Sequence, residues 1–172
     1  MIIDKILLTE NEINSICTSL GEKITSDYQG SDLVLVGLLK GCNPFISDLA
    51  KKIDLPLEIE YMVASSYKGN TFSSGNVEIR LDLSKSIENR DVLIVEDIVD
   101  TGKTLDVVKK ILINRNPKSL KIVTLLDKVE GRLIPCECDY VGRKIEKAFV
   151  VGYGLDYNDK YRNLPYVAIV KI

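Results

Sequence analysis

The hydrophobic residues of this chain form short apolar runs that alternate with segments of helical spacing. Nearly unbroken apolar runs predict strands that are buried on both faces, as in a parallel sheet. They lie at residues 33–39, 92–95, 122–126, 149–151 and 167–170. Residues 57–63 and 77–81 alternate apolar and polar positions instead, which predicts two further strands.

Helical spacing appears between these runs, at residues 13–20, 45–50 and 105–112, and Pro44 suits the first turn of the second helix. Strands that alternate with helices indicate an α/β fold with a mostly parallel sheet. The runs that end at Leu39, Val95 and Leu126 each lead into a polar turn. We therefore expect a ligand at the carboxyl ends of these strands. Residues 65–75 are rich in Ser, Gly, Asn and Thr, which predicts a mobile loop.

Composition narrows the class of protein. A length of 172 residues with 45% hydrophobic content suits one compact domain. The net charge of −2 offers no basic field for nucleic acid or an anionic membrane. No apolar stretch approaches the length of a membrane span, and no secretion signal is apparent, so we expect a cytoplasmic protein.

The cysteines and the missing histidines limit the chemistry further. In a chain of this length with no apparent secretion signal, the four cysteines require no disulfide framework. Cys136 and Cys138 are expected to be loop thiols rather than a zinc site, because no second pair lies at ligand spacing. The chain has no histidine, which excludes catalytic triads with a histidine base. Proton transfer is left to Asp, Glu, Lys, Tyr or Cys.

Residues 92–105 are the most informative segment. The apolar run is followed by Glu96, Asp97 and Asp100, and then by residues 101–104 (Thr-Gly-Lys-Thr), which open a helix. The free N–H groups at a helix N-terminus attract a phosphate, and carboxylates accept hydrogen bonds from ribose hydroxyls. The segment therefore predicts a site for a phosphorylated sugar.

This segment has two alternative interpretations. An ATP-binding P-loop needs a glycine five positions before Gly102, where Asp97 stands, and a carboxylate there would repel a triphosphate. Alternatively, the acids would only cap the helix and solvate the turn.

Residues 96–104, Glu-Asp-Ile-Val-Asp-Thr-Gly-Lys-Thr, resemble the phosphoribosyl-pyrophosphate motif of the type I phosphoribosyltransferases, in their hypoxanthine-guanine branch. The resemblance extends in order through nearly the whole chain, at residues 39–41, 66–67, 125–128 and 149–157. It implies the type I phosphoribosyltransferase fold, a mostly parallel central sheet flanked by helices. Residues 1–172 would form a single domain whose small hood comes from about residues 1–12 and 128–172.

The resemblance also implies an activity. The enzyme would act in purine salvage and transfer the 5-phosphoribosyl group from phosphoribosyl pyrophosphate to hypoxanthine or guanine. Its products would be inosine or guanosine monophosphate and pyrophosphate. Mg²⁺ is the implied cofactor, and a homodimer or homotetramer the implied assembly.

The residues for the sugar and its 5′-phosphate lie in the acidic segment. We expect Glu96 and Asp97 to hold the ribose hydroxyls and, with Asp156, to lie at the metal. Asp100 is the candidate general base for the purine proton. The 5′-phosphate is assigned to the turn Asp100, Thr101, Gly102, Lys103 and Thr104, although Lys103 could equally face solvent.

Pyrophosphate and purine are assigned to the other segments. Leu39, Lys40 and Gly41 resemble the pyrophosphate loop of the family, in which the Leu-Lys peptide can be cis, although Cys42-Asn43 departs from the small residues common there. The remaining pyrophosphate residues are Arg162 and, in the loop that closes over the site, Ser66 and Tyr67. The purine residues are Lys128 for the 6-oxo group, Phe149 for stacking, the main chain of Val150, and Asp156.

The same residues bear on several alternative functions. A regulator that keeps this fold without catalysis predicts a basic face or an eroded acidic turn, and the chain has neither. A receiver-like phosphoacceptor leaves residues 149–157 unexplained. Adenine, xanthine and pyrimidine transferases also compete, but Lys128 and residues 149–157 favour hypoxanthine and guanine.

Overall fold

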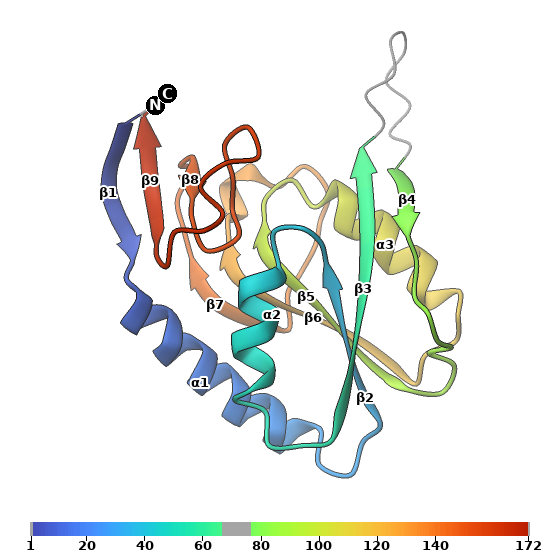
Figure 1. Cartoon of the computed structure of the whole chain (residues 1–172). Helices are drawn as coiled ribbons and strands as arrows, with labels where there is room; N and C mark the ends of the chain where they lie inside the picture. Colours follow the sequence, from blue (N-terminus) through green and yellow to red (C-terminus); the bar gives the residue numbers. More distant parts are fainter. Residues whose placement is uncertain (1, 67–76, 172) are drawn as a thin grey trace, which may run out of the picture.

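The structure, a computed structural model, describes residues 2–66 and 77–171 and contains two sheets (Figure 1). The strands of the large sheet have the order β4-β3-β2-β5-β6-β7. Their bounds are β2 (Leu33–Leu38), β3 (Leu57–Ser66), β4 (Val77–Leu81), β5 (Asp91–Val99), β6 (Ser119–Asp127) and β7 (Tyr140–Lys144). The small sheet has the order β1-β9-β8, with β1 (Ile2–Leu8), β8 (Val150–Val151) and β9 (Val167–Lys171). The helices are α1 (Glu10–Asp27), α2 (Asn43–Ala50), α3 (Lys103–Ile113) and the 3₁₀ helix η1 (Val129–Gly131).

The predicted α/β class with a mostly parallel sheet is confirmed. Strands β3, β2, β5, β6 and β7 pair in parallel, and only β4 runs antiparallel to its neighbour β3 within the described large sheet. The register places Val36 beside Ile94 and Ile94 beside Ile122. The carboxyl ends of β2, β5 and β6 therefore meet at one edge, where the polar turns follow.

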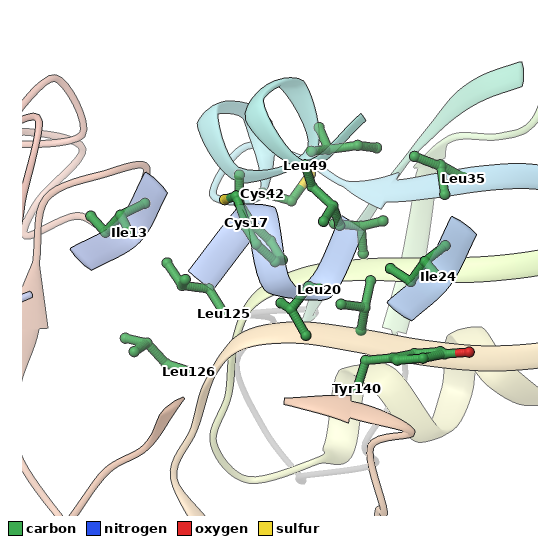
Figure 2. Packing of buried hydrophobic residues seen from close by; sticks show 14 of the residues in the cluster. Ile13, Cys17, Leu20, Ile24, Leu35, Cys42, Leu49, Leu125, Leu126 and Tyr140 are labelled. Carbon is green, nitrogen blue, oxygen red and sulfur yellow. The ribbon is translucent and has the colours of Figure 1, made fainter. Parts of the chain in front are cut away.

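Helices cover both faces of the large sheet. The central strands β2, β5 and β6 are largely buried on both faces, so their successive residues enter two cores. Leu35, Leu93 and Val123 pack with α1 and α2, whereas Val36 and Ile94 pack with α3. Figure 2 shows the first core, in which the side chains labelled on α1 are Ile13, Cys17, Leu20 and Ile24. None of the described helices is long and apolar enough to cross a membrane.

Two strands exceed the predicted bounds. The apolar run after Val92 predicts a strand end at Val95, but β5 continues to Val99 and pairs Glu96 with Thr124 and Val99 with Asp127 of β6. The acids are thus held by ladder hydrogen bonds instead of by a loose turn. Likewise β3 continues to Ser66, which pairs with Val77, so residues 65 and 66 belong to a strand instead of to the predicted loop. Residues 67–76 lie outside the described residues.

The N- and C-terminal segments form the small sheet, as the expected hood implies, but with different bounds. Strand β7 lies inside the segment 128–172 assigned to the hood, yet it pairs with β6 and extends the large sheet. Strand β1 pairs antiparallel with β9, and α1 begins at Glu10, directly after it. Thr9 caps this helix through a reciprocal bond pair with Glu12. The small sheet thus draws on Ile2–Leu8 and on two strands after Phe149.

Candidate active site

The turn between β5 and α3 lies at the edge where the central parallel strands end. Gly102 is the N-cap of α3 and has φ +80°, a conformation that favours glycine. Thr101 Oγ1 accepts a hydrogen bond from the Lys103 N–H at 3.4 Å. The first N–H groups of α3 have no carbonyl partner within the helix, and the positive end of the helix dipole lies here. The turn therefore has the geometry of an anion-binding helix N-terminus.

A cavity of about 310 Å³ opens beside this turn. It brings together four segments that are far apart in sequence: residues 38–41 at the end of β2, Ala64 of β3, residues 96–102 with Thr104 and Leu105, and Arg162. Lys103 does not line it, and its side chain is exposed, which agrees with the solvent-facing alternative.

Glu96 and Asp97 line the cavity as half-buried carboxylates. Burial raises the pKa of Glu96 well above its ordinary value, and the neighbouring charge of Asp97 adds to this shift. Burial also raises the pKa of Asp97, to about 6, although the Ile98 N–H that donates to Asp97 Oδ1 at 2.8 Å works against the shift. Two adjacent carboxylates in such surroundings favour a partner that donates hydrogen bonds or carries positive charge.

The loop after β2 packs against Asp97. The Leu39–Lys40 peptide is cis, as the resemblance allows. A Cβ on Gly41 would overlap Asp97 Oδ2, and a Cβ on Gly154 would overlap the Gly41 carbonyl oxygen. Only glycines allow this close approach of the loop, the carboxylate and the Gly152–Leu155 turn. The Lys40 ammonium, 3.2 Å from Asp159 Oδ1, is exposed.

Arg162 is fixed at the rim of the cavity by acids and a carbonyl. Its Nη2 lies 2.8 Å from Asp156 Oδ1 and 3.2 Å from Asp159 Oδ1, and its Nη1 donates to the Gly154 carbonyl at 2.7 Å. Its buried Nε has no hydrogen-bond partner among the described residues. A buried Nε cannot reach a ligand, so any contact with an anion would fall to the two Nη groups.

A second cavity, of about 270 Å³, adjoins the first and shares Asp97, Ile98 and Asp100 with it. Lys128 Nζ lies 2.8 Å from Asp100 Oδ2, and the lysine side chain is only 13% exposed. This pairing explains why a charged residue can follow a buried strand. The other side chains predicted for the purine also line this cavity.

Phe149 lines this second cavity and is partly exposed to solvent. It is 43% exposed, and its ring meets Tyr157 edge to face, with centroids 5.8 Å apart and the planes at 85°. Val150 is buried in β8 beside it. An exposed aromatic face next to strand main chain is suited to a planar ligand.

The remaining predicted residues are placed as follows. Asp156 lies in the second cavity, paired with Arg162, rather than beside Glu96 in the first. Within residues 2–66 and 77–171, no three acidic, cysteine or histidine side chains converge as a metal cluster. Ser66 ends β3, and Tyr67 lies outside the described residues. Cys136 and Cys138 are free thiols in the loop before β7.

Sequence reasoning missed several contacts that shape the site. Gly131 approaches Asp100 so closely that a Cβ would overlap Asp100 Oδ1. Asp127 and Arg132 form a buried ion pair behind the turn. The two charged residues were visible five positions apart at the end of a predicted strand, but nothing in the pattern paired them.

An anion-binding turn at α3, acids beside it and an adjoining pocket for a planar group define a phosphoribosyltransferase site. A family model described as the phosphoribosyl transferase domain matches residues 5–158, and the chain belongs to this family.

Within the family, the chain is similar to the hypoxanthine-guanine phosphoribosyltransferase of Staphylococcus aureus. They are 54% identical over 169 residues, which cover 98% of this chain and 94% of the relative. A crystal structure of a hypoxanthine phosphoribosyltransferase from the same species superposes with a TM-score of 0.94 at 54% identity, covering 98% and 92% of the two chains. A hypoxanthine phosphoribosyl transferase structure from Trypanosoma cruzi gives a TM-score of 0.93 at 43% identity, with the same coverage. The resemblance to the hypoxanthine-guanine branch is thereby confirmed.

Proposed function

We propose that the protein transfers the 5-phosphoribosyl group of phosphoribosyl pyrophosphate to hypoxanthine or guanine, a reaction of purine salvage. The observation that carries the proposal is the shared wall of the two cavities, formed by Asp97, Ile98 and Asp100. One cavity has a helix N-terminus and carboxylates, and the other has Lys128 and Phe149. A sugar phosphate in the first and a base in the second would meet at this wall, where the new bond forms.

On the sugar side, the turn before α3 binds the 5′-phosphate through its main-chain N–H groups and the hydroxyls of Thr101 and Thr104. Glu96 and Asp97 accept hydrogen bonds from the ribose hydroxyls. Their raised pKa values indicate that such donors would stabilise the ionised carboxylates.

On the base side, Lys128 donates to the 6-oxo group and Phe149 stacks on the ring. The purine N9–C1′ bond forms as the C1′–oxygen bond to pyrophosphate breaks, and the proton on purine N7 passes to Asp100. The Lys128 ammonium already lies 2.8 Å from Asp100 Oδ2, so the two groups can act on neighbouring atoms of one ring.

The pyrophosphate lies against residues 39–41 and Arg162, which adjoin the first cavity. The planar guanidinium suits phosphate oxygens. Ser66, which ends β3, and Tyr67 are further proposed contacts of the pyrophosphate.

Magnesium is the proposed cofactor. Glu96 and Asp97 fit it, since hard carboxylate oxygens are its preferred protein ligands and it retains several waters when it binds with a phosphate substrate. Asp156 would contribute only if Arg162 released it, because the two are paired at 2.8 Å. When bound, the ion would neutralise charge on the leaving pyrophosphate.

A spectrophotometric assay of each purine with phosphoribosyl pyrophosphate, with and without Mg²⁺, tests the function. We expect conversion of hypoxanthine and guanine but not adenine, and only with the metal. Lys128→Gln should weaken discrimination against adenine, since the donor to the 6-oxo group is lost. If no base were converted under any condition, the proposed activity would be wrong.

We further propose that the protein is a homodimer or homotetramer. We also propose that it acts in the cytoplasm, because phosphorylated sugars do not cross membranes and are retained there. The oligomeric state of the Trypanosoma cruzi relative is the subject of one of the similar structures. Light scattering after size exclusion would give the mass in solution, and a monomer at micromolar concentration would contradict the assembly.

A further inference from the structure

Residues 128–136, which follow β6, lie directly beneath the phosphate-binding turn. We call them the support segment. It carries the Lys128 ion pair to Asp100 at one end, and Gly131 packs against the same carboxylate. Further along, the N–H groups of Leu133 and Ile134 both donate to the Thr101 carbonyl, at 3.0 and 3.1 Å.

The contact continues under Gly102. A Cβ at this position would lie 2.8 Å from the Ile134 carbonyl oxygen and 3.2 Å from Arg132 Cδ. The turn and the support segment therefore touch at each of residues 100–102: through the Asp100 carboxylate, the Thr101 carbonyl, and Gly102, where a side chain would have no room. Any shift of the support segment must shift the turn.

One side chain joins the support segment to the large sheet. The Arg132 guanidinium donates to Asp127 Oδ1 at the end of β6 and to the Cys136 carbonyl, and it reaches the Val99 carbonyl at the end of β5 at 3.5 Å. The side chains of Arg132 and Asp127 are only 12% and 10% exposed. A single planar fork thus connects the ends of two strands with the far end of the support segment.

We propose that Arg132, through its ion pair with Asp127, is a positioning residue that holds the phosphate-binding turn in the shape that binds the 5′-phosphate. The inference rests on the proposed function for the identity of the ligand. Arg132 stands behind the turn, so it acts through the support segment and not on the substrate. Without the guanidinium, Asp127 remains a buried unpaired charge and the Cys136 carbonyl loses its donor. The support segment then loses its fixed position, and the N–H groups of the turn no longer converge on one phosphate.

The test compares Arg132→Met and Arg132→Lys with the wild-type chain. Calorimetric titration with ribose 5-phosphate reports on the sugar-phosphate site without purine or pyrophosphate, and steady-state kinetics report on turnover. We expect Arg132→Met to raise the Kd for ribose 5-phosphate and the KM for phosphoribosyl pyrophosphate by roughly 10- to 100-fold. The fall in kcat should be much smaller, because the contact is lost in the ground state and the transition state alike. Arg132→Lys should restore part of the affinity.

Arg90→Met is the matched control, because Arg90 is also a largely buried arginine (16% side-chain exposure) that joins Asp32 and Glu58. It lies at the amino ends of the strands, away from the turn. We expect it to lower the melting temperature without changing either ligand constant. If Arg132→Met fails to fold, the double variant Asp127→Ala/Arg132→Met removes the buried charge and should fold, yet still bind ribose 5-phosphate weakly.

The inference would be overturned if foldable Arg132 variants bound ribose 5-phosphate within twofold of wild type, or if Arg90→Met weakened binding equally. Failure of the proposed function gives a different result. In that case the wild-type chain would convert no purine, while the loss of ribose 5-phosphate affinity in the Arg132 variants would still report the role of the arginine.

Discussion

At the scale of single residues, the site contains charges in surroundings that oppose them. Glu96 and Asp97 are adjacent, half-buried and raised in pKa, chiefly by burial. Without ligand, these ionised carboxylates therefore lower the stability of the folded chain at neutral pH. Ligand binding can relieve this cost. Such perturbed groups are typical of functional sites rather than of stable cores.

The pH dependence of stability should show this cost. The pKa of Asp97 rises from 3.8 to about 6 in the folded chain, so between these values the unfolded chain releases a proton that the folded chain keeps. Stability from this group is thus highest below pH 4 and lost as the pH rises through 6. Asp97→Asn should raise the free energy of unfolding at pH 8 by at most about 3 kcal/mol, and less where water reaches the carboxylate. Denaturant unfolding at pH 8 and pH 3.5 measures the difference, and an equal effect at both values would contradict it.

Removal of the proposed general base should separate binding from chemistry. Asp100→Ala leaves the N–H groups of the turn in place, but it removes the proton acceptor and frees Lys128. We expect turnover to fall by roughly 10²–10⁴ while ribose 5-phosphate binding changes little. Single-turnover kinetics provide the measurement, and a normal rate would assign the proton to another group.

Single residues were the part of the site that sequence reasoning could reach. The acids, the turn and Lys128 were visible because each interrupts an apolar pattern. Their partners were not visible, because the ion pair between Lys128 and Asp100 spans 28 positions and depends on two strands lying side by side. The engagement of Asp156 by Arg162 was likewise hidden, since both were expected to face ligand.

At the scale of elements, apolar runs and apolar–polar alternation predicted every described strand except β1 and β7. Strand β1 is largely exposed and has two register shifts against β9, so its residues neither cluster nor alternate regularly. Strand β7 is short and contains Gly142, where an added Cβ would clash with the Leu125 carbonyl of β6. Such strands are fixed by their neighbours rather than by their own sequence.

The loop between β2 and α2 gives a prediction at this scale. Gly41→Ala places a methyl group where Asp97 Oδ2 lies, so the loop or the carboxylate must move. We expect the KM for phosphoribosyl pyrophosphate to rise at least about tenfold, because sugar and pyrophosphate contacts are displaced together. Gly30→Ala is the control: it strains a backbone at φ +74° with no atom within 4 Å of the added carbon. It should lower stability and leave KM unchanged, and an equal KM for both variants would refute the packing argument.

At the scale of the whole molecule, the small sheet is joined to the large one beside the site. The Tyr153 hydroxyl, just after β8, donates to Asp48 of α2 at 2.7 Å, and Tyr153 is 7% exposed. The adjoining Gly154 packs on Gly41. The proposed purine cavity and the proposed pyrophosphate site are thus connected through α2 and the loop that precedes it.

Tyr153→Phe should weaken this junction. It removes the hydroxyl that donates to Asp48 and lies 3.4 Å from the Pro44 carbonyl, without changing the ring, so we expect a loss of about 1 kcal/mol in the free energy of unfolding. Circular dichroism in urea gives the value, and Asp48→Asn completes a double-mutant cycle. Strict additivity of the two substitutions would mean that the hydroxyl and the carboxylate do not interact.

The pairing of the small sheet has a consequence for the growing polypeptide. Strand β9 lies between β1 and β8, with Lys171 beside Ile2 and Ala168 beside Val151. Of the described strands it emerges last from the ribosome, so β1 must wait for a partner almost the full length of the chain away. The turn between β5 and α3 is synthesised much earlier, and the strands β5 and β6 beside it both precede β8 and β9. A nascent chain should therefore gain the ability to hold a sugar phosphate before it can hold a base.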